Sequence, residues 1–451
     1  MKVLCYIRPW GEKYYQYLCD NEPSFSEVKY ISDFRRVDKV GLVKKFYQHL
    51  SSESNNQLST INDLDREDIF LRCRLLRSLP ENAAQTMFRA MEDSINSILD
   101  EVQPDIILGI TVDSYVLDTL RICGQKRNIP YIGMVPVFIN GYFRITARGE
   151  LNKIRKPDDN ECDVVLSMLL EQVYQPVYMS KHNNIYKKLL QVYAKELMKS
   201  VYFPIKSVLT NDRSNYHYLI SGRLAKEHIG ISQLYPQLFF DQDWEKKVAS
   251  WDGPIVYLPL QFYPEATIDY WVKQIEFIDY HASVLETVKS LSRSALILVK
   301  EHPAMIGFRD TAFYRRLRKC INTVLVPSTV TSNWLIESCD VVVIWTGTAG
   351  FEAALRGKPV ITFGNPYFCS GQMFTHIDSI EQLKNLSIES IIQNIHSPSR
   401  NDLIEMVRHV LSGCLPGIFK HVGFSASEPK QQRNAHDVCL SLEKYVIAGL
   451  S

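Results

Sequence analysis

Three short apolar runs between residues 295 and 364 constrain the fold most strongly. They are Ala-Leu-Ile-Leu-Val at 295–299, Val-Val-Val-Ile-Trp at 341–345 and Pro-Val-Ile-Thr-Phe at 359–363. Each run is rich in β-branched residues and ends in polar or turn-forming residues. Such continuous runs are typical of strands that are buried on both faces of a parallel sheet. The sequence therefore predicts an α/β domain whose ligand lies at the carboxyl ends of its strands.

Further apolar runs extend this domain and predict a second one. Runs at 255–260 and 323–326 bring the number of predicted strands in the second half of the chain to five. Nearer the N-terminus, runs at 3–7, 104–109 and 129–133, with a helical pattern between the last two, predict a βαβ unit of a separate domain. The predicted fold class is therefore α/β, with two Rossmann-like domains.

Most of the remaining segments are predicted to be helical. Residues 159–250 show helical, polar and aromatic patterns with neither a Gly/Ser linker nor an internal repeat, so we expect a helical elaboration between the domains. Residues 268–291 predict a single long helix, and residues 331–339 predict a short one with Ser332 as its cap. The last amphipathic pattern, at 435–447, predicts a helix that packs back on the first domain.

The composition argues against several classes of protein. A net charge of +1 over 451 residues gives no signal for nucleic-acid binding. The 10 cysteines show neither a Cys-x-x-Cys pair nor zinc-ligand spacing, which favours reduced thiols. The N-terminal apolar run is shorter than that of a signal peptide, and no apolar run approaches the roughly 20 residues of a membrane-spanning helix. We therefore expect a cytoplasmic protein.

Polar residues that suit a phosphate ligand follow two neighbouring predicted strands. Because the carboxyl ends of parallel strands meet at one edge of a sheet, we expect these residues to surround one ligand. His302 is a candidate for hydrogen-bonding or protonating a leaving phosphate. We assign nucleotide binding to Lys300, Thr346, Gly347, Thr348 and Glu352.

Each of these residues also has a purely structural alternative. A His-Pro pair at a strand end is common in turns, and the Thr-Gly-Thr stretch can simply cap a helix. Glu352 can be an acidic residue that the first turn of a helix favours, and Lys300 can be a solvated residue at the end of its strand. The occurrence of the whole set at neighbouring strand ends favours the nucleotide site.

Two carboxylates are candidates for the catalytic base or nucleophile. Asp113 and Glu265 each follow a predicted strand, so both are expected at the cleft between the domains. The structural alternative for Asp113 is a helix cap. No metal is expected, because the stretch Asp-Gln-Asp at 241–243 does not follow a sheet strand and is interpreted as a polar loop.

Three motifs in the second half of the chain resemble those of one protein family. They are Pro-Glu-Ala-Thr at 264–267, Val-Lys-Glu-His-Pro at 299–303 and Thr-Gly-Thr-Ala-Gly-Phe-Glu at 346–352. Together they resemble the bacterial capsule polysaccharide biosynthesis family. Glu-Ala-Ala-Leu-Arg-Gly-Lys-Pro-Val at 352–360 resembles an element that is widespread in GT-B glycosyltransferases. The resemblance covers about residues 254–364.

A basic, turn-rich loop at 141–150 is a candidate for contacts with an acceptor. Loops that follow sheet strands often carry binding residues, and the stretch 143–150 looks like a further feature of the same family. We assign acceptor binding to Arg144 and Arg148. The alternative is a surface hairpin.

The resemblance implies a GT-B fold, in which two domains face each other across a cleft, and a transferase that needs no cofactor. The family includes transferases that use CMP-Kdo, and its motifs are similar to those of bacterial sialyltransferases, although this chain lacks their Asp/Glu-Asp/Glu-Gly element. We expect transfer of a CMP-activated acidic sugar, such as Kdo, to a glycan or lipid-linked glycan acceptor. The alternatives are a GT-B transferase that uses a UDP- or GDP-sugar, and a non-catalytic subunit of a polysaccharide assembly complex.

These expectations divide the chain into four parts. They are an acceptor domain (1–158), a helical elaboration (159–250), a nucleotide-sugar domain (251–420) and a C-terminal helix (421–451). A peripheral contact with the inner membrane surface is a further expectation, with solvated helix faces as the alternative reading of the same residues. The candidate basic residues are Arg315, Arg316, Arg318 and Lys319, or Lys44 and Lys45.

Overall fold

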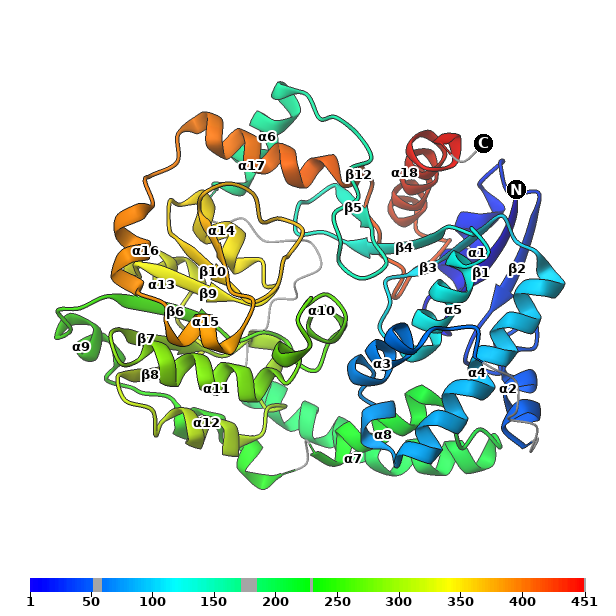
Figure 1. Cartoon of the computed structure of the whole chain (residues 1–451), viewed down its shortest axis with the longest axis horizontal. Helices are drawn as coiled ribbons and strands as arrows, with labels where there is room; N and C mark the ends of the chain where they lie inside the picture. Colours follow the sequence, from blue (N-terminus) through cyan, green and yellow to red (C-terminus); the bar gives the residue numbers. More distant parts are fainter. Residues whose placement is uncertain (52–58, 172–184, 228–229, 450–451) are drawn as a thin grey trace.

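The structure, a computed structural model, describes residues 1–51, 59–171, 185–227 and 230–449. These residues form two α/β domains, each built on a six-stranded sheet (Figure 1). One sheet contains strands from both ends of the chain, whereas the strands of the other all lie between residues 255 and 376. The predicted fold class is confirmed.

The first sheet has the strand order β12-β5-β4-β3-β1-β2. β1 to β4 run parallel, and β5 pairs antiparallel with both β4 and β12. The strands are β1 (Lys2–Tyr6), β2 (Glu27–Ile31), β3 (Ile106–Ile110), β4 (Tyr131–Pro136), β5 (Tyr142–Ile145) and β12 (Cys414–Pro416). The helices of this part are α1 (Glu12–Asp20), α2 (Leu42–Ser51), α3 (Asp63–Arg72), α4 (Glu81–Val102) and α5 (Tyr115–Gln125).

The second sheet is parallel throughout, with the order β11-β10-β9-β6-β7-β8. Its strands are β6 (Ile255–Pro259), β7 (Leu296–Lys300), β8 (Thr323–Val326), β9 (Val341–Ile344), β10 (Val360–Thr362) and β11 (Phe374–His376). Its helices are α10 (Ala266–Asp269), α11 (Tyr280–Leu291), α12 (Thr311–Leu317), α13 (Ser332–Ser338), α14 (Ala349–Leu355), α15 (Ile380–Lys384) and α16 (Ile388–Asn394).

Further helices connect the two domains. Figure 1 shows α7 and α8 along one edge of the molecule and α6 and α17 along the opposite edge. The helices between the sheets are α6 (Asp159–Leu169), α7 (Ile185–Leu209), α8 (Tyr216–Glu227) and α9 (Trp244–Ala249). The C-terminal ones are α17 (Arg400–Ser412) and α18 (Pro429–Tyr445).

The chain returns to the first domain before its last helix. β12 lies within the range 251–420 that we assigned to the second domain, yet it pairs with β5 of the first sheet. α17 packs on α6, and α18 packs on β12 and α1. A three-residue strand whose pairing partner lies far away in the sequence leaves no periodic pattern, which is why β12 was not predicted.

The prediction of one helix over 268–291 is wrong, because this segment is divided between α10 and α11. Arg72 at the end of α3 donates hydrogen bonds to the carbonyl oxygens of Asp269 (3.0 Å), Val272 (2.7 Å) and Lys273 (2.9 Å). Carbonyl groups that accept hydrogen bonds from a guanidinium of the other domain are less available to accept the backbone hydrogen bonds of a continuous helix. The break therefore serves contact between the domains.

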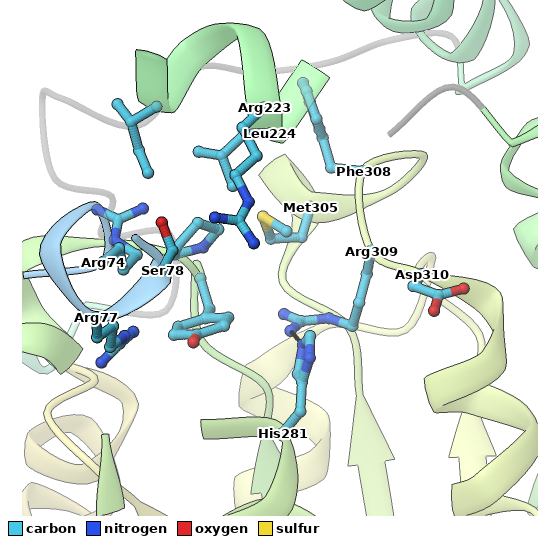
Figure 2. Close-up of a pocket in the computed structure, with 13 residues that line it drawn as sticks. Arg74, Arg77, Ser78, Arg223, Leu224, His281, Met305, Phe308, Arg309 and Asp310 are labelled. Carbon is cyan, nitrogen blue, oxygen red and sulfur yellow. Dashed lines mark hydrogen bonds between the residues drawn. The ribbon is translucent and has the colours of Figure 1, made fainter. Parts of the chain in front are cut away.

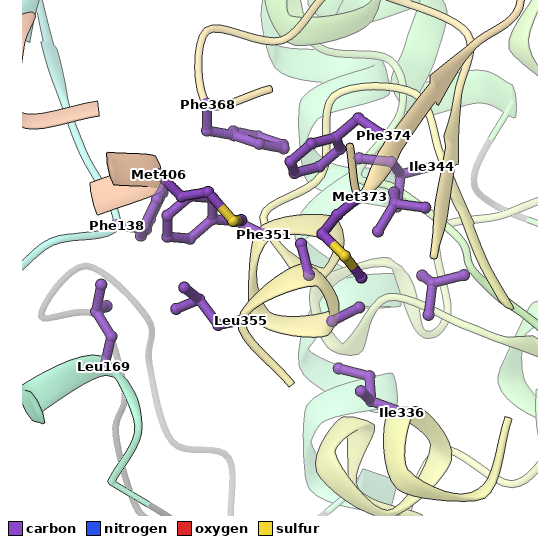
Figure 3. Close-up of a cluster of buried hydrophobic side chains, with 14 of the residues drawn as sticks. Phe138, Leu169, Ile336, Ile344, Phe351, Leu355, Phe368, Met373, Phe374 and Met406 are labelled. Atoms are coloured by element: carbon purple, nitrogen blue, oxygen red, sulfur yellow. The ribbon is translucent and has the colours of Figure 1, made fainter. Parts of the chain in front are cut away.

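One hydrophobic cluster joins the two domains (Figure 3). Phe138, which follows β4, packs against Phe351 of α14 with ring centroids 5.1 Å apart, and against Phe368 at 6.1 Å. Leu169 of α6 and Met406 of α17 belong to the same cluster. Because these apolar side chains are buried together, the cluster fixes the position of the strand ends of one sheet relative to those of the other.

Two further findings concern thiols and membranes. All ten cysteines lie in the described ranges and none forms a disulfide, in agreement with the reduced thiols predicted. No helix of the described ranges has both the length and the hydropathy needed to cross a bilayer.

Candidate active site

Lys300 is the last residue of β7, and its side chain is buried at the carboxyl end of the second sheet. Its Nζ atom donates a hydrogen bond to Ser332 Oγ, in the first turn of α13, at 3.2 Å. Burial lowers the pKa of Lys300, while the charge of Glu352 acts to raise it. Lys300 is therefore not the solvated residue of the structural alternative. It belongs to a polar cluster in which Ser332 of α13 binds it directly and Glu352 of α14 acts on it through its charge.

Ser332 is a member of this cluster that the sequence analysis misread as a helix cap. The cap of α13 is Thr331, whose side chain accepts a hydrogen bond from Trp334 N at 3.3 Å. Ser332 Oγ instead accepts hydrogen bonds from Lys300 and from the Tyr257 hydroxyl, the latter at 3.3 Å. The signal was present, because Ser332 follows β8, which pairs with β7.

The turn after β7 is held by a fully buried ion pair. Arg309 Nε lies 2.6 Å from Glu301 Oε2, which also accepts a hydrogen bond from the Tyr314 hydroxyl at 2.6 Å. The other oxygen, Oε1, accepts from the backbone N–H of His302 at 2.5 Å. A buried pair with this many partners fixes the backbone on which His302 is placed.

His302 stabilises the turn after β7 through one ring nitrogen and carries its proton on the other. Its Nδ1 accepts a hydrogen bond from Ala304 N at 3.1 Å, so the proton of the neutral ring is on Nε2. The ring lies edge-on to Phe262, with centroids 5.9 Å apart. The turn interpretation and the functional one are thus compatible, because the same imidazole caps the turn through one nitrogen and has an N–H donor at the other.

Thr346 and Gly347, after β9, bind neighbouring protein groups. Thr346 is buried, and its hydroxyl donates to the carbonyl oxygen of Thr267 at 3.1 Å. With the Gln261 amide oriented to match its surroundings, its oxygen accepts from Thr346 N at 2.9 Å and from Gly347 N. A Cβ atom at Gly347 would lie 2.6 Å from this amide. Both residues therefore position the loop, and a side chain at Gly347 would displace the Gln261 amide.

Thr348 and Glu352, at the start of α14, are both partly exposed. Thr348 precedes α14, yet its side chain makes no capping hydrogen bond, so the capping alternative fails for this hydroxyl. Glu352 is half-buried in the first turn of α14. Burial raises the pKa of Glu352, and the charges of Arg356 and Lys300 oppose this shift.

Glu265 lies at the boundary of the domains, just before α10. Its carboxylate accepts a hydrogen bond from the Thr267 hydroxyl at 2.6 Å. The side chain is exposed to solvent, but the protein atoms gathered around it desolvate the carboxylate and raise its pKa, while the charge of Arg74 from the first domain acts to lower it. A raised pKa suits a carboxylate that takes a proton from a hydroxyl group.

Asp113, unlike Glu265, is held in an ion pair by an arginine. Arg8 holds it in a bidentate ion pair with both N–O distances at 2.6 Å. Burial acts to raise the pKa of Asp113, but the Arg8 guanidinium outweighs it and holds the pKa below its usual value. The cap of α5 is the neighbouring Ser114. A paired carboxylate with a lowered pKa is a weak base, so Glu265 is the better candidate.

Arg144 is buried rather than exposed on a hairpin. Its guanidinium donates to the carbonyl oxygens of Glu150 at 2.7 Å and Gly149 at 3.3 Å. It also lies 3.3 Å from the ring centroid of Tyr367, a residue of the second domain. These contacts make Arg144 a positioning residue of the domain boundary.

Arg148 is likewise bound by protein groups. Its Nε donates to Asp118 Oδ1 at 2.9 Å, and a terminal nitrogen donates to Asp68 at 2.5 Å. These two carboxylates belong to α5 and α3 of the first domain. The basic loop therefore has structural partners for both arginines that we assigned to acceptor binding.

A cavity of about 640 Å³ opens between the domains, beside Tyr263 and Pro264 (Figure 2). Arg223 and Arg309 reach into it from different sides. Arg74 and Arg77 line it from the first domain, and both form ion pairs with the buried carboxylate of Asp269, at 2.6 and 3.3 Å. The sequence analysis missed this site, because its arginines converge from segments far apart in the chain. Its four arginines outnumber the three carboxylates around them, Asp269, Glu301 and Asp310, and this excess of positive charge suits an acidic group.

The two parallel-rich sheets, the cavity between the domains and the polar cluster at the strand ends define a GT-B-like α/β protein. Residues 166–378 match the family model described as capsule polysaccharide biosynthesis protein. The matched residues contain all three motifs that suggested the family, so the expected resemblance is confirmed for this part of the chain. Asp113, Arg144 and Arg148 lie outside it.

Solved structures similar to this chain include two from Thermosulfurimonas dismutans. KpsC, beta Kdo 2,7 transferase, has a TM-score of 0.39 and 12% identity, over 98% of this chain and 99% of that chain. KpsC, beta Kdo 2,4 transferase, has a TM-score of 0.35 and 13% identity, over 75% and 87%. UDP-GlcNAc 2-epimerase from Neisseria meningitidis has a TM-score of 0.30 and 11% identity, over 98% and 100%. Comparison with curated proteins gives no match.

Proposed function

We propose that the protein is a metal-independent GT-B glycosyltransferase of surface polysaccharide synthesis. It transfers a CMP-activated acidic sugar, such as Kdo, to a glycan or lipid-linked glycan acceptor. The observation that carries this proposal is the polar cluster of Lys300, Ser332 and Glu352 beside His302, at the carboxyl end of the second sheet. All four residues lie within the stretch that matches the family model.

The donor side of the reaction uses groups that stabilise a leaving phosphate. The ammonium of Lys300 and the Nε2–H of His302 offset the charge that develops as the bond from the anomeric carbon to the phosphate oxygen breaks. The Thr348 hydroxyl adds a further donor, and Glu352 accepts hydrogen bonds from the ribose hydroxyls. One ammonium and one imidazole suit the single phosphate of a CMP-sugar better than a diphosphate.

The acceptor side uses the boundary between the domains. Glu265 takes the proton of an acceptor hydroxyl, whose oxygen forms the new bond to the anomeric carbon while CMP departs with the electron pair of the broken bond. Arg74 and Arg77 in the cavity hold an acidic group of the acceptor. Such a reaction takes place in the cytoplasm, where sugar nucleotides are available.

The donor class is tested by offering CMP-Kdo, CMP-sialic acid, UDP-sugars and GDP-sugars with an acceptor extract, and measuring the free nucleotide. We expect CMP release from a CMP-linked acidic sugar to be at least about a hundredfold faster than nucleotide release from the other classes. Glu265→Gln serves as the inactive control. Faster release of UDP or GDP would replace the donor in this proposal. Binding of CMP without release from any donor would favour a non-catalytic subunit.

A further inference from the structure

Helix α7 exposes an apolar stripe along most of its length. Exposed apolar residues recur at steps of three and four, so they lie on one face of the helix. The exposed fractions of Met198 (65%), Ile205 (53%) and Leu209 (80%) are those of surface side chains. The stripe consists of Leu190, Ala194, Leu197, Met198, Val201, Ile205, Val208 and Leu209.

The opposite face of α7 accounts for its attachment to the protein. Leu189 and Glu196 are buried, and Phe203 stacks on Tyr218 of α8 with ring centroids 6.0 Å apart. α7 packs along α8, and Figure 1 shows the pair at one edge of the molecule. The stripe is therefore the outward face of a helix that is already packed, and such a surface marks a binding site.

The charges of α7 indicate what binds there. Its sequence contains five lysines and a single acidic residue, Glu196, which is buried and pairs with Lys199 at 2.6 Å. Lys195, Lys199 and Lys206 lie four and seven residues apart, in a row beside the stripe. A second copy of the chain would find no exposed carboxylate on α7 to pair with these lysines. A bilayer with anionic lipids can bury the stripe in its interfacial region and pair its headgroups with the row of lysines.

We propose that α7 docks the protein on an anionic membrane surface, with its stripe in the interfacial region and its lysines at the headgroups. This surface differs from the basic clusters at 315–319 and 44–45, which have no apolar stripe beside them. α8 also lines the arginine cavity through Arg223 and Leu224, so a lipid-borne acceptor would enter from the docked side. That corollary rests on the proposed function, whereas the docking itself does not.

The test uses the full chain and vesicles of phosphatidylcholine with or without an equal share of phosphatidylglycerol. We expect sedimentation with the anionic vesicles and partial release at high salt. Val201→Glu with Ile205→Glu should lower the vesicle affinity at least about tenfold. Lys195→Glu should weaken binding at low salt only.

A matched double variant controls for added charge and for folding. Leu64→Glu with Val164→Glu changes two exposed aliphatic residues outside α7 and should bind vesicles like the original protein, while thermal unfolding should be similar for both double variants. Equal loss of binding in the control would overturn the proposal. So would the absence of vesicle binding together with a dimer, seen by sedimentation velocity, that the α7 variant dissociates.

Discussion

Replacement of His302 by alanine is expected to lower turnover by about two to four orders of magnitude, with CMP affinity changed by less than about threefold. The reason is that the Nε2–H, directed by the hydrogen bond from Ala304 N to Nδ1, acts on charge that exists only as the phosphate leaves. Single-turnover rates and calorimetric titration with CMP measure the two quantities separately.

The matched control for this prediction is His436→Ala, which removes an exposed imidazole of α18 and should leave turnover unchanged. His302→Gln keeps an N–H donor and should recover part of the rate. Loss of CMP affinity with an intact turnover number would contradict the catalytic assignment and make His302 a group that positions the donor.

Glu265→Gln is expected to cause a loss of similar size, about two to four orders of magnitude. A base acts in its deprotonated form, so the rate of the unmodified protein should rise with pH through the pKa of Glu265 and then level off. Because desolvation raises this pKa, the rise should lie above the usual range of a glutamate. The residual rate of the Gln variant should lack this limb.

Asp113→Asn separates the two carboxylates. Its ion pair with Arg8 lowers the pKa of Asp113, so its titration lies below the rising limb and the variant should retain that limb. If Asp113→Asn abolished the limb and Glu265→Gln did not, the base would be Asp113. A pH–rate profile of each variant decides between them.

The buried parallel strands could be predicted because their signal is local. β7 and β9 are formed by continuous apolar runs, and the structure places both within a residue or two of the predicted positions. β2 alternates polar and apolar residues at the edge of its sheet, and β5 and β12 are short antiparallel strands. The break after α10 depends on Arg72 from the other domain. The alternation of β2 is a strand pattern that the sequence analysis did not use, whereas the short strands and the break after α10 have no local pattern that sequence periodicity detects.

The candidate site could also be predicted only in part from the sequence. The strand-end rule led to Lys300, which the structure joins to Ser332 and places near Glu352. It did not distinguish residues that meet a ligand from those, such as Thr346, that bind their own neighbours. The arginines of the loop after β5 look available in the sequence, yet their partners come from distant segments.

The central claim is that a CMP-linked sugar binds at the carboxyl ends of the second sheet. Its most direct test is calorimetric titration of CMP, UDP and GDP into the protein and into Glu352→Ala, with Glu443→Ala on α18 as the matched control. We expect CMP to bind at least about tenfold more tightly than UDP or GDP, and Glu352→Ala to weaken CMP binding by about tenfold or more. Equal binding of the three nucleotides, or CMP affinity that is unchanged in Glu352→Ala, would contradict the claim.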